Sequence, residues 1–538
     1  VCSSDLARTA AEFEAGRVAY ELGTGWQCKA DDKMPHLNGE YSVKELRLSK
    51  GTCPEGIAAT VVLSGESVLS DPDGVQYYYG KANETVSGTI SGIPAGYTIV
   101  FEPAASRDDH NFTLRVQAPR VSYTYTLIKA DIEWYADNQS TKKYAFKTPD
   151  ELVGLALLAN GKVQAAETFE EWMLTLANDI DLSGIAWTPI GNTTSLKFAG
   201  TFDGKGNKIT GLSIHSDDVQ HIGLFGNVNV TGKVQCLQIE GNIDASWSKG
   251  GSFYVGGIVG NNKGSVTNCL SRVTVTAENT GGAYANVCVG GVVGNNEGKI
   301  EFCWNKGNVQ GTGGTTVYTS VGGVVGSGNA TNCANFGEVT GNGSTGGISG
   351  SGAVSNSYNL GDVTGAANMT YGISYGTVNN SYYVCKLNDT DKKAYVNNAS
   401  ENEVKYNEAD KTYTVGDDAA LLVDTLNKNR DGNTPWFVNQ DEGVYLPIHV
   451  LKWTGDQNDR FTGKIITITY YPNGGVNKDG VDDPISVPVT LTPDIITGGF
   501  NAKSYTILAA DSETLGFKHE NGVFAVWKDK SNTEYAAG

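Results

Sequence analysis

Apolar and polar residues alternate in short runs along most of the chain, and glycines separate the runs. Between residues 40 and 128 the runs ATVVLSG, TIVFEP and NFTLRVQAP have the two-residue period of half-buried strands. From about residue 200 to residue 385, apolar residues instead gather around glycines, as in FYVGGIVGNN from Phe253. This pattern predicts an all-β chain with many short strands.

One segment has a helical pattern. The run TPDELVGLALLANG places Thr148 at the N-cap, Pro149 at the first helical position and Gly161 just beyond the end. We expect a short amphipathic helix near residues 149–160 that caps the strands which follow it and covers their open edge.

The glycine phrases recur at nearly regular intervals. Their first glycines are Gly223 (GLFG), Gly257 (GIVG), Gly291 and Gly323 (GVVG), Gly347 (GISG) and Gly372 (GISYG), with spacings of 34, 34, 32, 24 and 25 residues. A period in this range is typical of stacked supersecondary units. The shortest period fits one coil of a right-handed parallel β-helix, with three short strands and three turns per coil. Such a solenoid is our predicted fold.

In a solenoid of this kind, equivalent residues of successive coils lie one strand spacing apart, roughly 4.8 Å. Three rows of equivalent residues are therefore expected to stack. They are an inward aliphatic row (Ile258, Val292, Val324, Ile348, Ile373), a small-residue row (Cys236, Cys269, Cys303, Cys333, Ser357, Ser381) and an Asn row (Asn268, Asn332, Asn356, Asn380, with Phe302 as the exception). The Asn amides would hydrogen-bond along the stack, and the cysteines would be free thiols. The paired glycines would form tight corners where neighbouring coils leave no room for a Cβ. The backbone at these corners could also have φ above zero.

The rungs resemble the GLUG motif of bacterial surface proteins. The run NDIDLSGIAWTPIGNTTSLKFAGTFDGKGNKITGLSI, residues 178–214, is similar to the coils that open the repeat in that family. The resemblance covers about half of the chain, and the last two rungs are degenerate. It implies a β-helix in a secreted or cell-wall-attached protein.

The flanking segments predict further modules. AAEFEAGRVAYELGTGWQ resembles the segment that closes GLUG coils, and DDAALLVDTLNKNRDGNTPWFVNQ is similar to a second copy. KIITITYYPNGGVNKDGVDDP resembles a Listeria–Bacteroides repeat, but ENGVFAVW stands where a G-Y-x-F-x-G-W run is usual. The first six residues, VCSSDL, resemble a translated sequencing adaptor, so we expect a fragment. The expected domains are 1–39 (closing segment of a preceding solenoid), 40–128 (β-sandwich), 129–400 (solenoid), 401–455 (closing segment) and 456–538 (truncated repeat-like β domain).

Composition excludes some function classes. The formal net charge of -19 disfavours nucleic acid as a partner. No apolar run is long enough for a membrane helix. The nine cysteines include no CxxC pair, so no metal or cofactor is expected. Cys28 and Cys53 either form a disulfide or remain two free thiols.

Catalytic residues are also not indicated. Arg272 is the only arginine between residues 130 and 400, and Asp179, Asp181 and Asp203 are explained equally well by turn formation. The run GISYG matches G-x-S-x-G but lies in a rung, and NKDGVDD lacks the glutamate that closes an EF-hand loop. We therefore expect no enzyme. The alternatives are a β-helix enzyme acting on polysaccharide and an accessory region of a surface peptidase whose catalytic domain lies outside this sequence.

The three longer coils carry their extra residues at one register, in DASWSKGGSFY, TAENTGGAYANV and GTGGTTVYTS. Insertions at one register project from one side of a solenoid. Trp247, Tyr254, Tyr284 and Tyr318 would give that side an aromatic face suited to a host or neighbouring-cell glycan or protein. The alternative is longer strands with ordinary half-exposed tyrosines. The sequence thus predicts a monomeric, extracellular, non-catalytic spacer and adhesin.

Overall fold

The structure is a computed structural model, which describes residues 7–388 except 33, 65–67, 109, 118, 282–285 and 315–317. Beyond residue 388 it describes 393–396, 437–441, 444–448, 464–471, 476–477, 479, 484–491, 508, 515, 527–528 and 534–535. From residue 437 onward the described strands form three two-stranded antiparallel pairs: β42 (Phe437–Asp441) with β43 (Val444–Ile448), β44 (Lys464–Tyr470) with β45 (Ile485–Leu491), and β46 (Trp527–Lys528) with β47 (Glu534–Tyr535). The predicted closing segment 401–455 lies mostly outside the described residues.

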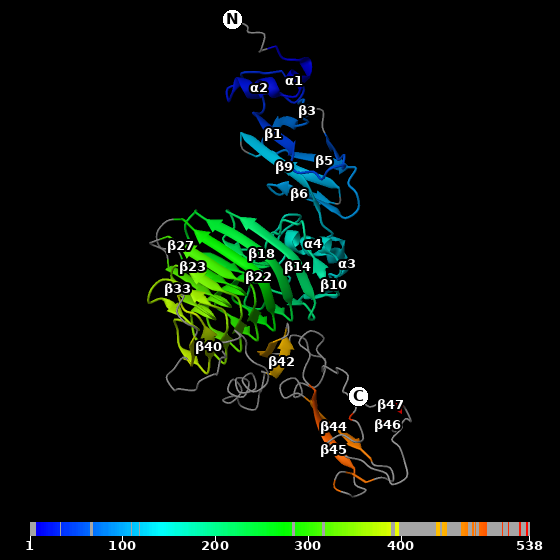
Figure 1. Cartoon of the computed structure of the whole chain (residues 1–538). Coiled ribbons are helices and arrows are strands. Elements are labelled where there is room, and N and C mark those ends of the chain that lie inside the picture. The colour runs from blue at the N-terminus through cyan, green and yellow to red at the C-terminus, as the bar shows by residue number, and fades with distance from the viewer. Residues whose placement is uncertain are drawn as a thin grey trace.

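The strands between Val43 and Lys129 form a β-sandwich of two sheets (Figure 1). Its first sheet has the order β3 (Val68–Ser70), β4 (Gln76–Lys81), β1 (Val43–Lys50), β9 (Arg120–Lys129), β6 (Tyr97–Glu102). Its second sheet has the order β2 (Thr60–Leu63), β5 (Thr85–Ser91), β8 (Asn111–Arg115), β7 (Ser106–Asp108). The strand β5 is exposed and buried at alternate residues, as its sequence pattern requires.

Two short helices precede the sandwich, α1 (Ala10–Glu14) and α2 (Arg17–Leu22). Ala15, Ala19 and Cys28 form a small buried cluster with Val43 and Tyr79 of the first sheet. Residues 7–42 thus pack on the sandwich. Cys53 lies against a different cluster and is a free cysteine whose Sγ donates to the Ile57 carbonyl at 3.3 Å, so it forms no bridge with Cys28.

The sandwich is joined to the solenoid through helices α3 (Glu133–Asp137) and α4 (Pro149–Ala159). The helix α4 has Thr148 at its N-cap and proline in its first turn, as predicted, and Thr148 also forms a capping box with Glu151. Residues 151–159 are all buried. Arg107 of β7 donates to the carbonyls of Ile99 and Val163, which ties the sandwich to the loop after α4. Helix α4 therefore caps the solenoid, as predicted, and also joins it to the sandwich.

The solenoid has four parallel sheets, which we call S1 to S4, and each coil passes through them in that order. S1 contains β10 (Lys143–Phe146), β11 (Met173–Leu176), β13 (Thr201–Asp203), β17 (Lys233–Gln235), β21 (Ser265–Thr267), β25 (Lys299–Glu301), β30 (Ala330–Thr331), β35 (Val354–Ser355) and β39 (Val378–Asn379). S2 contains β12 (Ile180–Asp181), β14 (Lys208–Ser216), β18 (Gln238–Trp247), β22 (Leu270–Asn279), β26 (Trp304–Asn305), β27 (Val309–Gly313), β31 (Ala334–Asn335), β32 (Val339–Gly341), β36 (Tyr358–Asn359), β37 (Val363–Thr364), β40 (Tyr382–Cys385) and the antiparallel β41 (Lys393–Val396).

The remaining strands lie on either side of the glycine phrase. S3 contains β15 (His221–Ile222), β19 (Phe253–Gly256), β23 (Asn286–Gly290), β28 (Tyr318–Gly322), β33 (Ser344–Gly346) and β38 (Thr370–Tyr371). S4 contains β16 (Phe225–Val228), β20 (Val259–Asn262), β24 (Val293–Asn296), β29 (Val325–Gly328) and β34 (Ser349–Ser351). The fold class is as predicted, but a coil has four sheets where three strands were expected, because the glycine phrase is itself a corner.

The glycine corner explains the repeated phrase. A Cβ on Gly256 would lie 2.2 Å from the Val259 carbonyl oxygen and 2.6 Å from the Gly294 nitrogen of the next coil, and a Cβ on Gly260 would lie 2.6 Å from the Ile222 nitrogen. None of these glycines has a left-handed φ. Close backbone approach, and not φ above zero, is therefore the reason for glycine here.

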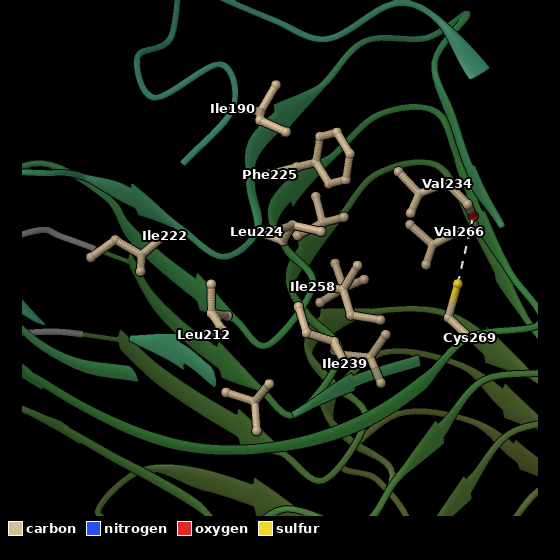
Figure 2. Packing of buried hydrophobic residues seen from close by; sticks show 14 of the residues in the cluster. Ile190, Leu212, Ile222, Leu224, Phe225, Val234, Ile239, Ile258, Val266 and Cys269 are labelled. Atoms are coloured by element: carbon tan, nitrogen blue, oxygen red, sulfur yellow. Dashed lines mark hydrogen bonds between the residues drawn. The ribbon is translucent and has the colours of Figure 1, made fainter. Parts of the chain in front are cut away.

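The predicted inward aliphatic row is present. Ile258, Val292, Val324, Ile348 and Ile373 are all fully buried, and the amide of each residue but the last donates to its equivalent in the next coil. They belong to a single core that runs through the solenoid (Figure 2).

The small-residue row needs one correction. Gln235 pairs with Thr267 and Gln238 with Leu270, so the equivalent of Cys269 is Leu237 and not Cys236. Cys236 instead joins the Asn row, whose members Asn268, Phe302, Asn332, Asn356 and Asn380 all have φ between 44° and 56°. The alignment of the glycine phrases therefore placed Cys236 one position away from its true row. The left-handed turn stands directly before the small-residue row, and Cys236 belongs to that turn. The thiols of Cys269, Cys303 and Cys333 are buried and free, and those of Cys303 and Cys333 donate to the carbonyl two residues before.

Amide hydrogen bonds along the stack occur mainly in other rows. In the predicted row, the side chain of Asn380 donates to Oδ1 of its equivalent Asn356. A continuous ladder instead links Asn305 to Asn335 and Asn335 to Asn359 at 2.8 Å each, with every amide also bonded to the glycine two residues later. We call this the Asn-Gly ladder. It lies in S2, directly after the small-residue row.

Candidate ligand-binding face

The three longer coils place their extra residues at one junction, as predicted. The junction joins S2 to S3, between β18 and β19, between β22 and β23, and between β27 and β28. The register is shared, since Asp244 pairs with Thr276 and Asn286 pairs with Tyr318. One side of the solenoid therefore carries all three insertions.

Trp247 does not lie on the exposed face. It is 9% exposed, its ring stacks on Phe253 with 6.2 Å between centroids, and its Nε1 donates to the Gly250 carbonyl at 2.7 Å. The last residue of β18 points inward, so this tryptophan closes the turn and belongs to the core.

Tyr254 and Tyr318 share the outward face of S3. Val255 and Val321 of the same strands point into the core, so the residues beside them, Tyr254 and Ser320, point outward. Tyr318 lies two residues before Ser320 and two strands from Tyr254, which places the two tyrosine Cα atoms roughly 12 Å apart. Tyr318 is 75% exposed, whereas Tyr254 is half-buried. Tyr284 lies outside the described residues.

A buried histidine explains why Tyr254 is held in place. The His221 ring stacks on the Tyr254 ring with 5.1 Å between centroids and an interplanar angle of 12°. Nδ1 of His221 lies 2.7 Å from Oδ1 of Asn227, which also accepts from Asn261. Burial lowers the pKa of His221 below its usual range and raises that of Tyr254. Both rings are therefore neutral at pH 7, and their wide separation in the sequence gave no signal of this contact.

The three aspartates considered for catalysis accept backbone hydrogen bonds, Asp181 and Asp203 within their own turns and Asp179 from the next coil. Oδ1 of Asp181 accepts from the Ser183 amide at 3.0 Å, that of Asp203 from the Lys205 amide at 2.8 Å, and that of Asp179 from the Lys208 amide at 2.8 Å. Among the described residues there is no group of three or more His, Cys, Asp or Glu side chains placed to hold a metal ion.

The G-x-S-x-G match is also part of the framework. Oγ of Ser374 donates to the Gly352 carbonyl at 2.7 Å and accepts from the Gly376 amide at 3.1 Å, in a rung of the solenoid and not in a strand-to-helix turn. NKDGVDD is described only in part, and the Asn477 side chain accepts from the Asp479 amide. In the described part of the chain, no helix is long and apolar enough to cross a membrane.

Comparison with known proteins gives partial similarities. The chain is 36% identical over 105 residues to a protein of Evansella cellulosilytica described as a candidate Gly-rich membrane protein, and 30% identical over 117 residues to halomucin of Haloquadratum walsbyi. These matches cover 18% and 22% of the chain, and only 12% and 1% of the two relatives. No family model matches the chain.

Among solved structures, a candidate immunoglobulin A1 protease from Bacteroides ovatus aligns with 58% of this chain and 93% of its own, at 19% identity and a TM-score of 0.40. At this level the likeness carries no argument about activity.

Proposed function

We propose that this chain is a non-catalytic part of a modular bacterial cell-surface protein, in which the GLUG-like solenoid is a rigid spacer with an adhesive face. The adhesive face would bind a glycan or protein of a host or of a neighbouring cell outside the producing bacterium. The resemblance to GLUG surface proteins supports this proposal, and so does the similarity to membrane and surface proteins.

The observation that carries the spacer role is the continuity of bonding between coils. The aliphatic row and the four parallel sheets run along the stack, so neighbouring coils are fixed to each other by backbone hydrogen bonds. The Asn-Gly ladder adds side-chain hydrogen bonds between three of these coils. Repeat arrays in which every unit contacts only its neighbours gain stiffness from such interfaces. Helix α4 and Arg107 extend the same connection into the sandwich.

The adhesive role is supported by Tyr318, which stands exposed on the side that carries the insertions. The experiment is to probe the full chain against immobilised glycans and extracellular-matrix proteins, beside Tyr318→Ala. Tyr471→Ala is the matched control, because this tyrosine is also highly exposed but lies outside the solenoid. Saturable binding that weakens only in Tyr318→Ala supports the proposal. The adhesive part is overturned if no probe binds, or if both variants bind like the parent chain.

A further inference from the structure

The last two coils of the described solenoid carry three tyrosines at positions where earlier coils have glycine or asparagine. Tyr371 pairs with Gly346, so it takes the place of the first glycine of the corner. Ser374 pairs with Ser349, which puts Tyr375 in the place of Gly350. Tyr383 pairs with Asn359 and takes the next position of the Asn-Gly ladder. We call Tyr371, Tyr375 and Tyr383 the terminal tyrosine cluster.

Side chains are excluded from the corner in the earlier coils. A Cβ on Gly346 would lie 2.1 Å from the Ser349 carbonyl oxygen and 2.7 Å from the Ile373 carbonyl oxygen of the following coil. A Cβ on Gly350 would lie 2.5 Å from the Val321 nitrogen of the preceding coil. In the described part of the chain S4 ends at β34 and S3 at β38, so Tyr371 and Tyr375 occupy the point where the corner stops.

The cluster is an ordered surface. The rings of Tyr371 and Tyr375 lie 5.5 Å apart at an angle of 51°, and the Tyr371 hydroxyl donates to the Asn368 carbonyl at 3.2 Å. The Tyr383 ring lies directly over Gly372, where a Cβ would be 2.3 Å from Cδ1. Tyr383 is half-buried, whereas Tyr375 is 63% exposed and Met369 is 42% exposed.

Covering the end of the stack does not explain this arrangement completely. A residue whose role is to close a core is buried by that core, as α4 is at the opposite end. Tyr383 fits that role, but Tyr375 presents most of its side chain to solvent beside a second ring. Adjacent exposed aromatic side chains are a common property of ligand-binding surfaces.

The charge around the cluster restricts the ligand. Between Val339 and Cys385 the only charged residue is Asp362, in a chain of net charge -19. Earlier coils carry ion pairs on their surface, such as Lys263 with Glu297 and Arg272 with Glu240. Residues 339–385 therefore offer no cationic side chain for an acidic glycan, a phosphate or a nucleic acid. The next described cations, Lys386 and, in β41, Lys393, follow Cys385 at the end of S2 and not at the corner that holds Tyr371 and Tyr375.

We infer that the terminal tyrosine cluster is a binding platform for a neutral glycan. A pyranose ring has one face of C–H groups that packs against an aromatic ring, and hydroxyls at its edge that need neutral hydrogen-bond partners. The platform supplies the rings of Tyr371 and Tyr375, and the surrounding segment supplies Ser, Thr and Asn side chains and backbone groups. This inference rests on the proposed adhesive role but uses a different surface from that of Tyr318.

The test is affinity electrophoresis of the full chain in gels that contain a neutral glucan, galactan or mannan, with a sulfated or uronic-acid polysaccharide in parallel. At least one neutral polysaccharide should retard the chain. Retardation should weaken by about tenfold or more in Tyr375→Ala, since an exposed aromatic anchor commonly contributes that much, and should persist in Tyr375→Phe, which keeps the ring.

Tyr318→Ala separates this inference from the proposed function. Loss of binding in Tyr375→Ala, with retention in Tyr318→Ala, supports the platform and removes the adhesive role of the insertion side. Loss in Tyr318→Ala alone does the reverse. The inference is overturned if no neutral polysaccharide retards the chain, if only the acidic polysaccharide does, or if Tyr375→Ala migrates like the parent chain.

Discussion

Asn335 is the central residue of the Asn-Gly ladder, and its replacement by alanine tests whether the ladder holds the coils together. Its Nδ2 donates to the Gly337 carbonyl and to Oδ1 of Asn359, both at 2.8 Å, and its Oδ1 accepts from Nδ2 of Asn305 at 2.8 Å. The residue is fully buried. Asn335→Ala therefore removes three hydrogen bonds, two of which join neighbouring coils.

The magnitude follows from these three bonds. A buried hydrogen bond contributes about 0.5–1.5 kcal/mol net, so the free energy of opening these coils should fall by about 3 kcal/mol. The amide partners are not left wholly unpaired, because Asn305 still donates to Gly307 at 2.7 Å and Asn359 still accepts from the Gly361 amide at 3.1 Å. No large additional penalty is expected. A change of 3 kcal/mol is about a hundredfold in the opening equilibrium.

Hydrogen–deuterium exchange measured by mass spectrometry resolves the effect by coil, which suits a repeat array whose coils open locally. Peptides covering β31, β32 and β36 should exchange about a hundredfold faster in Asn335→Ala, while peptides from β6 of the sandwich stay unchanged. Asn242→Ala, at an exposed position of β18, is the control. If Asn335→Ala exchanges no faster than this control, the ladder does not contribute the stability assigned to it.

Three further predictions concern the corner and the buried titratable groups. Gly290→Ala should destabilise the solenoid by about 1–3 kcal/mol, because its Cβ would lie 2.1 Å from the Val293 oxygen. Gly25→Ala is the control, since a Cβ there has nothing within 4 Å and should change the thermal midpoint little. Equal thermal midpoints of the two variants would contradict the close approach of the backbone at Gly290. Burial raises the pKa of Cys333 to about 12, so the folded chain keeps its proton while the unfolded thiol ionises, and stability should fall as pH rises above about 9. Urea unfolding at pH 7.5 and 10 should show a smaller loss in Cys333→Ser, and identical losses in both proteins would refute this assignment. Burial lowers the pKa of His221, so stability should fall as pH drops below about 6.5, where only the unfolded chain gains the proton. The thermal midpoints at pH 5.5 and 7.5 should differ less in His221→Gln than in the parent chain. The same difference in both proteins would contradict this role of His221.

The repeat could be predicted from the sequence because the same backbone contacts between coils recur at a nearly regular spacing. Glycine at Gly256 and Gly260 follows from backbone contact, and the capping box of α4 follows from Thr148, Pro149 and Glu151, which are neighbours in the chain. Spacing alone thus gave the register of the aliphatic row. The number of sheets in a coil was not accessible, since a glycine corner and a glycine within a strand look alike in sequence.

The other differences come from orientation. The left-handed turn at Cys236 shifts the small-residue row by one position, and a one-residue shift exchanges the two faces of a strand. Trp247 lies at the end of β18, where the pairing with β22 decides that it points inward. The Asn-Gly ladder was missed because it spans only three coils and stands between Ser271 and Tyr383. Its signal, Asn-x-Gly repeated at 305, 335 and 359, was present in the sequence.

The two ends of the solenoid meet their surroundings in different ways, and this difference bears on where a ligand would bind. At the first end, α4 buries the open core, and Arg107 and the ion pair of Lys162 with Glu102 connect it to the sandwich. At the last rung, the corner stops at tyrosines, one of which keeps most of its surface in solvent. An end that needed only closure could use a buried side chain, as Tyr383 does. The exposed ring of Tyr375, in a segment with almost no charge, therefore makes the last rung the part of the solenoid best suited to contact a neutral partner.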